Sequence, residues 1–260
     1  MLKRCLLAVI VALLVTSSQI AAAEDYDWSQ AKRIGTKAEL ARYIENERCN
    51  GNTKIRVIFT GERITGDELG YLVPCLDVKG NCYYMYDRTT RINCEIVEYP
   101  GTHVANAYRS GDISKLNVEE KKLYRLAVKI VAKANKRSSE KEKAEYIHKV
   151  ICDSVHGKNK NKRNETAIGA LIDHYANCEG FTDAFYMLGR MAGLNVGRIG
   201  GYINGNEGHA WNWITFADGK TYCVDVTLDN RYNTHEWFLA TFEVMKRHHS
   251  CEWEIIPNLQ

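Results

Sequence analysis

The sequence predicts an α+β fold in which helices precede an antiparallel sheet. Two capped helical patterns cover residues 117–135 and 139–157, and a third apolar helical pattern covers 181–192. Three strand-like stretches follow at 194–203, 208–216 and 221–227. An Asp-Gly turn separates the last two of these stretches. A helix followed by three such strands indicates an antiparallel meander with helices packed on it.

The first 23 residues are typical of a secretory signal peptide. Lys3 and Arg4 precede an apolar run at 6–15, and small residues end at Ala23, where we expect cleavage. The apolar run is well short of the roughly twenty residues that cross a bilayer. We therefore expect an exported protein, periplasmic, at the cell surface or extracellular, with no transmembrane anchor in the mature chain.

Charge and cysteine content narrow the class of protein further. The chain has 35 Lys and Arg against 32 Asp and Glu, so no large basic surface and no nucleic-acid partner are expected. Disulfides are the usual state of cysteines in exported proteins. The cysteine spacings give no zinc signature. The eight cysteines after the signal peptide are Cys49, Cys75, Cys82, Cys94, Cys152, Cys178, Cys223 and Cys251.

Residues 24–114 form a mixed α/β segment of unknown role. The pattern predicts a helix at 37–46 and a strand at 54–60, with strand-like runs near 82–86 and 92–99. A larger domain is expected at 115–250, followed by a tail at 251–260.

The helices of the larger domain have clear starting signals. Asn117 with Glu120, and Ser139 with Glu142, each have the spacing of a capping box. A short helical turn is expected at 167–175 and a further helix at 236–246. The helical pattern at 181–192 places Cys178 at a helix N-terminus.

Three residues of this domain suggest nucleophilic catalysis. A thiol attacks as thiolate, and a helix N-terminus beside an imidazole favours that form. Cys178 has the helix N-terminus, His209 lies in the second strand of the meander, and Asp225 lies in the third. A carboxylate on the neighbouring strand could orient the imidazole, which completes a catalytic triad.

The motifs around these residues resemble the transglutaminase-like superfamily, in the form of its exported bacterial members. They are NCEGFTDA at 177–184, GHAWN at 208–212 and VDVT at 224–227. The resemblance implies a papain-like core with Cys178 as nucleophile, His209 as general base and acid, and Asp225 as orienting residue. It implies no metal or organic cofactor. Where many members have a tryptophan beside the second aspartate of the third motif, this chain has Leu228 before Asp229.

The triad places a condition on the sheet, because His209 and Asp225 must share one face. A two-residue turn at 218–219 would put Asp225 on the wrong face. A three-residue loop at 217–219, with Gly219 in the left-handed conformation, pairs 216 with 220 and places Asp225 opposite Trp211. The sequence therefore predicts the three-residue loop.

Two further residues are weaker candidates. The backbone amide of Cys178 is the first donor for an oxyanion, and Tyr175, His174 or Asn177 could supply a second, of which Tyr175 is our candidate. Trp211 shares the face of His209 and is a candidate for substrate contact, with core packing as an equal alternative.

The function expected is acyl transfer from peptide or carboxamide bonds through a thioester. Such an enzyme is a cysteine protease or amidase (a hydrolase), or an acyltransferase such as a protein-glutamine transglutaminase. The expected partner is a protein or peptide substrate, a class that includes cell-wall peptide. Two alternatives stay open: a non-catalytic protein-binding module with the same fold, and a disulfide-linked structural protein in which Cys178 is bridged.

Overall fold

The computed structural model describes residues 27–157 and 161–257, and these divide into two compact units. One unit contains residues 27–69 and 78–96, and the other contains residues 70–77 and 97–257. The expected signal peptide at 1–23 lies outside the described residues. Within the described part of the chain, no helix is both long enough and apolar enough to cross a membrane.

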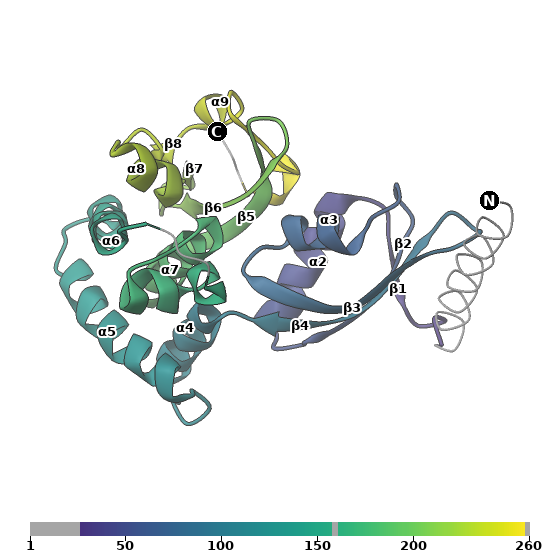
Figure 1. Cartoon of the computed structure of the whole chain (residues 1–260), viewed down its shortest axis with the longest axis horizontal. Coiled ribbons are helices and arrows are strands. Elements are labelled where there is room, and N and C mark those ends of the chain that lie inside the picture. The colour runs from purple at the N-terminus through teal and green to yellow at the C-terminus, as the bar shows by residue number, and fades with distance from the viewer. Residues whose placement is uncertain (1–26, 158–160, 258–260) are drawn as a thin grey trace, which may run out of the picture. The chain divides into compact units, whose positions relative to one another are not determined.

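The first unit is built on a four-stranded sheet with strand order β1-β2-β4-β3 (Figure 1). β1 pairs with β2 in parallel, and β2 pairs with β4 antiparallel. Thr36 and Glu39 form a capping box at the start of α2. The elements are β1 (Lys32–Ile34), α2 (Lys37–Cys49), β2 (Lys54–Phe59), α3 (Gly66–Leu72), β3 (Leu76–Tyr84) and β4 (Thr90–Glu98), of which α3, β3 and β4 each continue into the second unit.

The second unit contains the remaining elements. Its helices are α4 (Pro100–Ser110), α5 (Val118–Ala134), α6 (Glu140–Ser154), α7 (Cys178–Met191), α8 (Val226–Tyr232) and α9 (Phe242–Met245), with short helical turns η1 (Lys162–Glu165), η2 (Gly169–Asp173) and η3 (Trp253–Ile255). Its strands are β5 (Asn195–Ile203), β6 (Glu207–Thr215), β7 (Thr221–Val224), β8 (Phe238–Ala240) and β9 (His249–Ser250).

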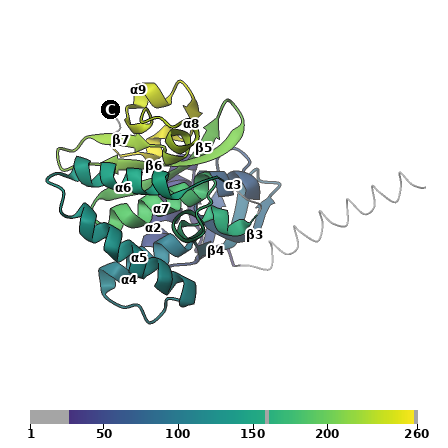
Figure 2. The ribbon, with the colours of Figure 1, turned by 60° about the vertical axis from the view of Figure 1, so that its left-hand side comes forward.

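A five-stranded antiparallel sheet divides this unit into two cores. Its strand order is β8-β7-β6-β5-β9, and α7 packs on β5 and β6 with α4, α5 and α6 around it (Figures 1 and 2). The larger core buries Phe185 of α7 against Ile214 of β6. The smaller core contains Trp211, Ile199 and Met245 of α9. Alternation along β6 separates the two cores, because Trp211 and Ile214 point to opposite faces.

The predicted α+β class and the main helices are confirmed. The side chain of Asn117 accepts a hydrogen bond from the Glu120 amide and Glu120 returns one, so the capping box starts α5 as expected. Ser139 caps α6 in the same way. Glu142 binds the Ser138 amide and hydroxyl, however, so the second capping box closes one residue earlier.

The predicted three-residue loop is also confirmed. Phe216 N–H donates to Lys220 O at 3.0 Å, and Gly219 has φ of 81°. The register pairs Asn212 with Val224, which places Asp225 opposite Trp211 in continuation. His209 and Asp225 therefore lie on the same face, as the triad requires.

Two expectations for the end of the domain are wrong. The third strand stops at Val224 rather than 227, because the Asp225 side chain accepts the Leu228 amide and starts α8. The segment at 236–246 is not one helix. Phe238 and Ala240 are buried in β8, which pairs with β7, and α9 starts only after Thr241. A short apolar run fits both the helical and the strand period, and here pairing with the sheet selects the strand.

Candidate active site

Cys178 occupies the first position of α7. The side chain of Asn177 accepts a hydrogen bond from the Gly180 amide at 3.2 Å and so caps the helix. The unsatisfied amides of the first turn and the helix dipole favour negative charge at this end. Cys178 carries a free thiol and is half-buried. The helix thus presents the thiol where an anion is stabilised, as the sequence predicts.

Gly180 is required by a close approach of the backbone. The carbonyl oxygen of Asn164 accepts the Asn177 amide at 3.0 Å, and a Cβ atom at Gly180 would overlap that same oxygen. A side chain at this position would push the start of α7 away from Asn164. The Cys-x-Gly spacing therefore has a packing reason, separate from the chemistry of the thiol.

A buried charge pair holds α7 in place behind the thiol. Asp183 is fully buried and accepts the amides of Gly101 at 3.0 Å and Ala167 at 2.9 Å. Burial raises the pKa of Asp183, and the Arg198 guanidinium, 3.6 Å away, opposes this. Arg198 also lies over the ring of Tyr186. Arg198 is therefore an internal structural residue and not an exposed one.

His209 and Asp225 form a buried pair. His209 Nε2 and Asp225 Oδ2 are 2.7 Å apart, so Nε2–H donates to the carboxylate and Nδ1 is left for a thiol. Asp225 Oδ1 accepts the Leu228 amide at 3.1 Å. Because Asp225 is both the N-cap of α8 and the partner of His209, its position is determined from two sides.

A second histidine shares the same carboxylate, and the sequence analysis missed it. His249 of β9 donates from Nε2 to Asp225 Oδ2 at 3.0 Å, and it is buried. β9 pairs with β5 at the edge of the sheet. The sequence offered only a histidine pair, His248 and His249, close to the predicted tail, and nothing in the local pattern indicated a strand of two residues.

The charges of this group stabilise each other. Burial alone would lower the pKa of His209, but the Asp225 carboxylate and the Cys178 thiol outweigh it, so the pKa of His209 is raised. Burial alone would raise the pKa of Asp225, but His209 and His249 outweigh it and hold the pKa well below its usual range. An imidazolium at His209 is therefore favoured beside the thiol.

The two weaker candidates lie outside the cleft that Cys178 and His209 line. Trp211 is 1% exposed, its ring stacks against His209 with centroids 5.9 Å apart, and it also contacts His249. This burial favours packing over substrate contact. Tyr175 is 40% exposed, and its backbone amide donates to Gly169 O at 3.0 Å. Only its hydroxyl could therefore serve as a donor.

Cys178 and His209 line one cleft of about 610 Å³. The start of α7 forms one wall, the start of β6 another, and α8 a third. Glu207 and Arg231 bring opposite charges to its rim, and both are exposed. The lining residues are Gly157, Ala176, Asn177, Cys178, Phe181, Glu207, Gly208, His209, Thr227, Asn230 and Arg231.

Residues 124–226 match the family model of the transglutaminase-like superfamily. This segment is a transglutaminase-like superfamily domain. It contains Cys178, His209 and Asp225, and the prediction of a transglutaminase-like α+β core is confirmed. No curated protein matches the chain in sequence.

Two solved structures are similar at low identity. A crystal structure of a TGase is 15% identical with a TM-score of 0.38, and the match covers 68% of this chain and 52% of that one. The periplasmic domain of TgpA from Pseudomonas aeruginosa is 11% identical with a TM-score of 0.36, and the match covers 63% of this chain and 66% of that one. The chain thus spans about half of the first and just under two thirds of the second.

A carboxyl group next to Cys178 takes up a proton near neutral pH. Burial raises the pKa of Glu179 to about 7, opposed by a hydrogen bond from Tyr99 and supported by the charges of Glu165, Asp183 and Asp77. The Tyr99 hydroxyl also lies 3.2 Å from Glu165 Oε2, and its one proton donates to only one of the two carboxyl groups at a time. These acidic groups gather behind the first turn of α7.

Replacing Glu179 by glutamine is expected to stabilise the protein at pH 8 and to change little at pH 4. The folded-state pKa is raised above the unfolded value, so the contribution of Glu179 to stability is fully present below about pH 4.5 and is lost as pH rises through 7. At 1.36 kcal/mol per pKa unit the gain at pH 8 is about 1–3 kcal/mol. Urea unfolding at both pH values measures it, with the exposed Glu236→Gln as control. An equal change at both pH values would contradict the assignment.

Proposed function

We propose that the chain is a cysteine-dependent acyl-transfer enzyme that acts on peptide or carboxamide bonds through a thioester on Cys178. The observation that carries the proposal is the arrangement of three groups in one place. A thiol at a helix N-terminus and an imidazole line the same cleft, and the imidazole donates to a buried carboxylate. The transglutaminase-like superfamily typically uses cysteine-based catalysis and also includes non-catalytic members, so activity needs a direct test.

The chemistry follows from the proton positions. The thiolate of Cys178 attacks the carbonyl carbon, a C–S bond forms, and the carbonyl oxygen becomes an oxyanion. The C–N bond then breaks, and the leaving amine takes its proton from the His209 imidazolium. Water or a second amine attacks the thioester while His209 accepts its proton, which releases the acid or the new amide and restores the thiol. Asp225 keeps the tautomer of His209 that these steps need.

We propose two donors for the oxyanion. The amide of Cys178 is in the first turn of α7, where no intrahelical acceptor exists. Asn177 uses Oδ1 to accept the Gly180 amide, which leaves its side-chain NH₂ group to donate, and it lines the cleft. We favour Asn177 over Tyr175, because Tyr175 does not line the cleft.

We favour hydrolysis to an acid over transfer to a protein amine. The choice of substrate is a separate question. The cleft rim carries Glu207 and Arg231, which suit a polar peptide with both charges, including cell-wall peptide. We assign this chemistry to residues 115–250 and none to residues 24–114. We further propose that the signal peptide at 1–23 exports the protein to a periplasmic, cell-surface or extracellular location.

Alkylation tests the proposal without knowledge of the substrate. Iodoacetamide is expected to modify Cys178 faster than the buried cysteines, because Cys178 lies at a helix N-terminus beside the His209 imidazolium. Cys82 is an internal control, since burial raises the pKa of its thiol to about 11. The rate at each site is measured by mass spectrometry of peptides between pH 4 and 9.

His209→Asn is the matching variant. It is expected to slow the alkylation of Cys178 at pH 6 by about tenfold or more and to leave Cys82 unchanged. Circular dichroism establishes that the variant is folded. A Cys178 that reacts no faster than Cys82, or that reacts equally in the variant, would favour the non-catalytic binding module instead.

A further inference from the structure

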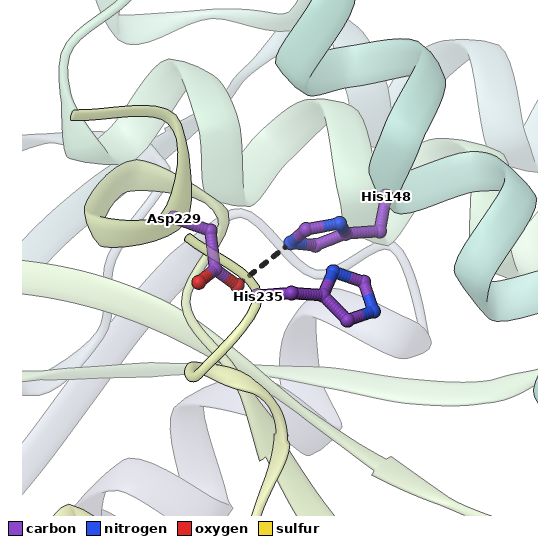
Figure 3. A group of neighbouring side chains, drawn as sticks. All are labelled: His148, Asp229 and His235. Carbon is purple, nitrogen blue, oxygen red and sulfur yellow. Dashed lines mark hydrogen bonds and ion pairs between the residues drawn. The ribbon is translucent and has the colours of Figure 1, made fainter. Parts of the chain in front are cut away.

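A second group of polar side chains lies apart from the candidate active site. His148 of α6, Asp229 of α8 and His235, which precedes β8, point toward one another (Figure 3). One ligand atom from each lies within 4.8 Å of the others. His148 and Asp229 are buried, whereas the His235 side chain is 53% exposed. The group is therefore open to solvent on one side.

The carboxylate of this group is held in a fixed orientation. Asp229 Oδ1 accepts the Thr234 hydroxyl at 3.0 Å and the Trp237 amide at 3.1 Å. Asp229 Oδ2 is thereby directed at His148 Nε2, 2.9 Å away. Metal-binding carboxylates are oriented by outer hydrogen bonds of this kind. A cation would take the place of the proton that the imidazole and carboxylate now share.

The donor set fits a divalent transition metal ion. Two imidazoles and one carboxylate are the protein ligands of many zinc sites that keep one position open. Glu145 lies 3.8 Å from His235 Nε2 and stands three residues before His148 on α6. A Glu-x-x-His pair on one helix face is a recurrent arrangement at metal sites. Water can supply the fourth ligand, and Glu145 lies beside His235 at the edge of the group.

A second Cys-His-Asp triad is the competing interpretation of this group. Cys152 lies one turn after His148, but its Sγ is 4.0 Å from Nδ1 and 3.9 Å from Nε2. Such equal distances place the sulfur against the ring and not on the line of one nitrogen lone pair. Burial also raises the pKa of the Cys152 thiol to about 12. Cys152 therefore lacks the geometry of an activated nucleophile.

We propose that His148, Asp229 and His235 bind a single divalent transition metal ion, with Zn²⁺ preferred, and that this ion fastens α8 to α6. Neither the cysteine spacings nor the family resemblance indicates a metal, and no local spacing connects His148 and Asp229, which are 81 residues apart. α8 begins directly after its N-cap, Asp225, and contributes Thr227 and Arg231 to the cleft. An ion at this position thus stabilises a wall of the candidate active site without touching the reacting atoms.

Zinc titration of the chelator-treated full chain tests the proposal. The Cys178→Ala background is used, so that a catalytic thiol does not bind the metal. Calorimetry is expected to show one site, and saturating Zn²⁺ is expected to raise the Tm by several degrees. His235→Ala is expected to weaken binding by about tenfold or more and to remove the Tm shift. Because His235 is exposed, we expect the His235→Ala variant to stay folded. His156→Ala, which removes an exposed histidine outside the group, is expected to match the parent.

Cobalt spectroscopy identifies the ligands independently. Co²⁺ in this site is expected to give absorption bands of a four- or five-coordinate ion with nitrogen and oxygen ligands, which His235→Ala removes. A thiolate-to-cobalt charge-transfer band would place the metal on a cysteine and overturn the assignment. Absence of Zn²⁺ binding, or binding unchanged in His235→Ala, would also overturn it. His249→Ala separates the site from the His209 and Asp225 group, and it is expected to leave the affinity for Zn²⁺ unchanged.

Discussion

Replacing Cys178 by alanine is expected to reduce kcat on a peptide amide substrate by on the order of 10⁶-fold, the usual cost of removing a nucleophile from a triad. The change removes one sulfur atom from a half-buried position at the start of α7. The cap from Asn177 does not depend on that sulfur, so the fold is expected to be preserved. The loss should appear in kcat, because the binding surfaces of the cleft remain.

Cys152→Ala is the matched control for that experiment. Cys152 also lies beside a histidine that pairs with an aspartate, namely His148 with Asp229. If a cysteine beside a histidine–aspartate pair were sufficient to make a nucleophile, both alanine variants would lose activity. Because only Cys178 lies at a helix N-terminus in a cleft with a paired histidine, Cys152→Ala is expected to keep wild-type turnover. Turnover is measured by release of amine from a peptide library. Retained activity in Cys178→Ala would refute a thioester on this residue.

Local signals in the sequence were sufficient for the parts of the site that depend on neighbours in the chain. The capping box of Asn117 and Glu120 predicted the start of α5, since both partners lie within one turn. The Asp-Gly turn predicted where β6 and β7 separate, but the length of the loop, and with it the register, followed from the condition that His209 and Asp225 share one face.

The parts that failed depend on contacts between distant segments. Asp225 reads as a strand residue by pattern, yet its side chain starts α8. His249 reaches Asp225 through a two-residue strand whose position depends on β5. The metal-binding group needs His148 and Asp229 together, and only the packing of α6 on α8 provides that. Periodicity carries no information about such pairs.

Asp225 accepts hydrogen bonds from two histidines, so its role is wider than orienting one imidazole. A carboxylate with one partner orients one imidazole. Here Oδ2 accepts from both His209 and His249, and Oδ1 accepts from Leu228. The same side chain therefore joins β6, β9 and α8, and its loss disturbs stability and chemistry together.

Replacing Asp225 by asparagine is accordingly expected to have the second largest effect. The amide keeps an oxygen for the Leu228 amide but turns an NH₂ group toward two imidazoles. His209 must then change tautomer, which removes the acceptor that the thiol needs, and kcat is expected to fall by on the order of 10⁴-fold. Breaking a buried pair costs about 3–5 kcal/mol of unfolding free energy at pH 7. Urea unfolding and amide turnover measure the two losses.

The pH dependence of that loss separates the charge from the shape of the side chain. The folded-state pKa of Asp225 is held well below its usual range, so its stabilising contribution is present above about pH 4 and is lost as pH falls through the folded-state pKa. The difference in unfolding free energy between wild type and Asp225→Asn should therefore shrink below pH 4. Asp183→Asn, at an equally buried aspartate that makes no described contact with His209, should reduce stability and leave the alkylation rate of Cys178 unchanged. If the Asp225 difference stayed constant down to pH 2, packing and not the paired charge would hold His209 in place.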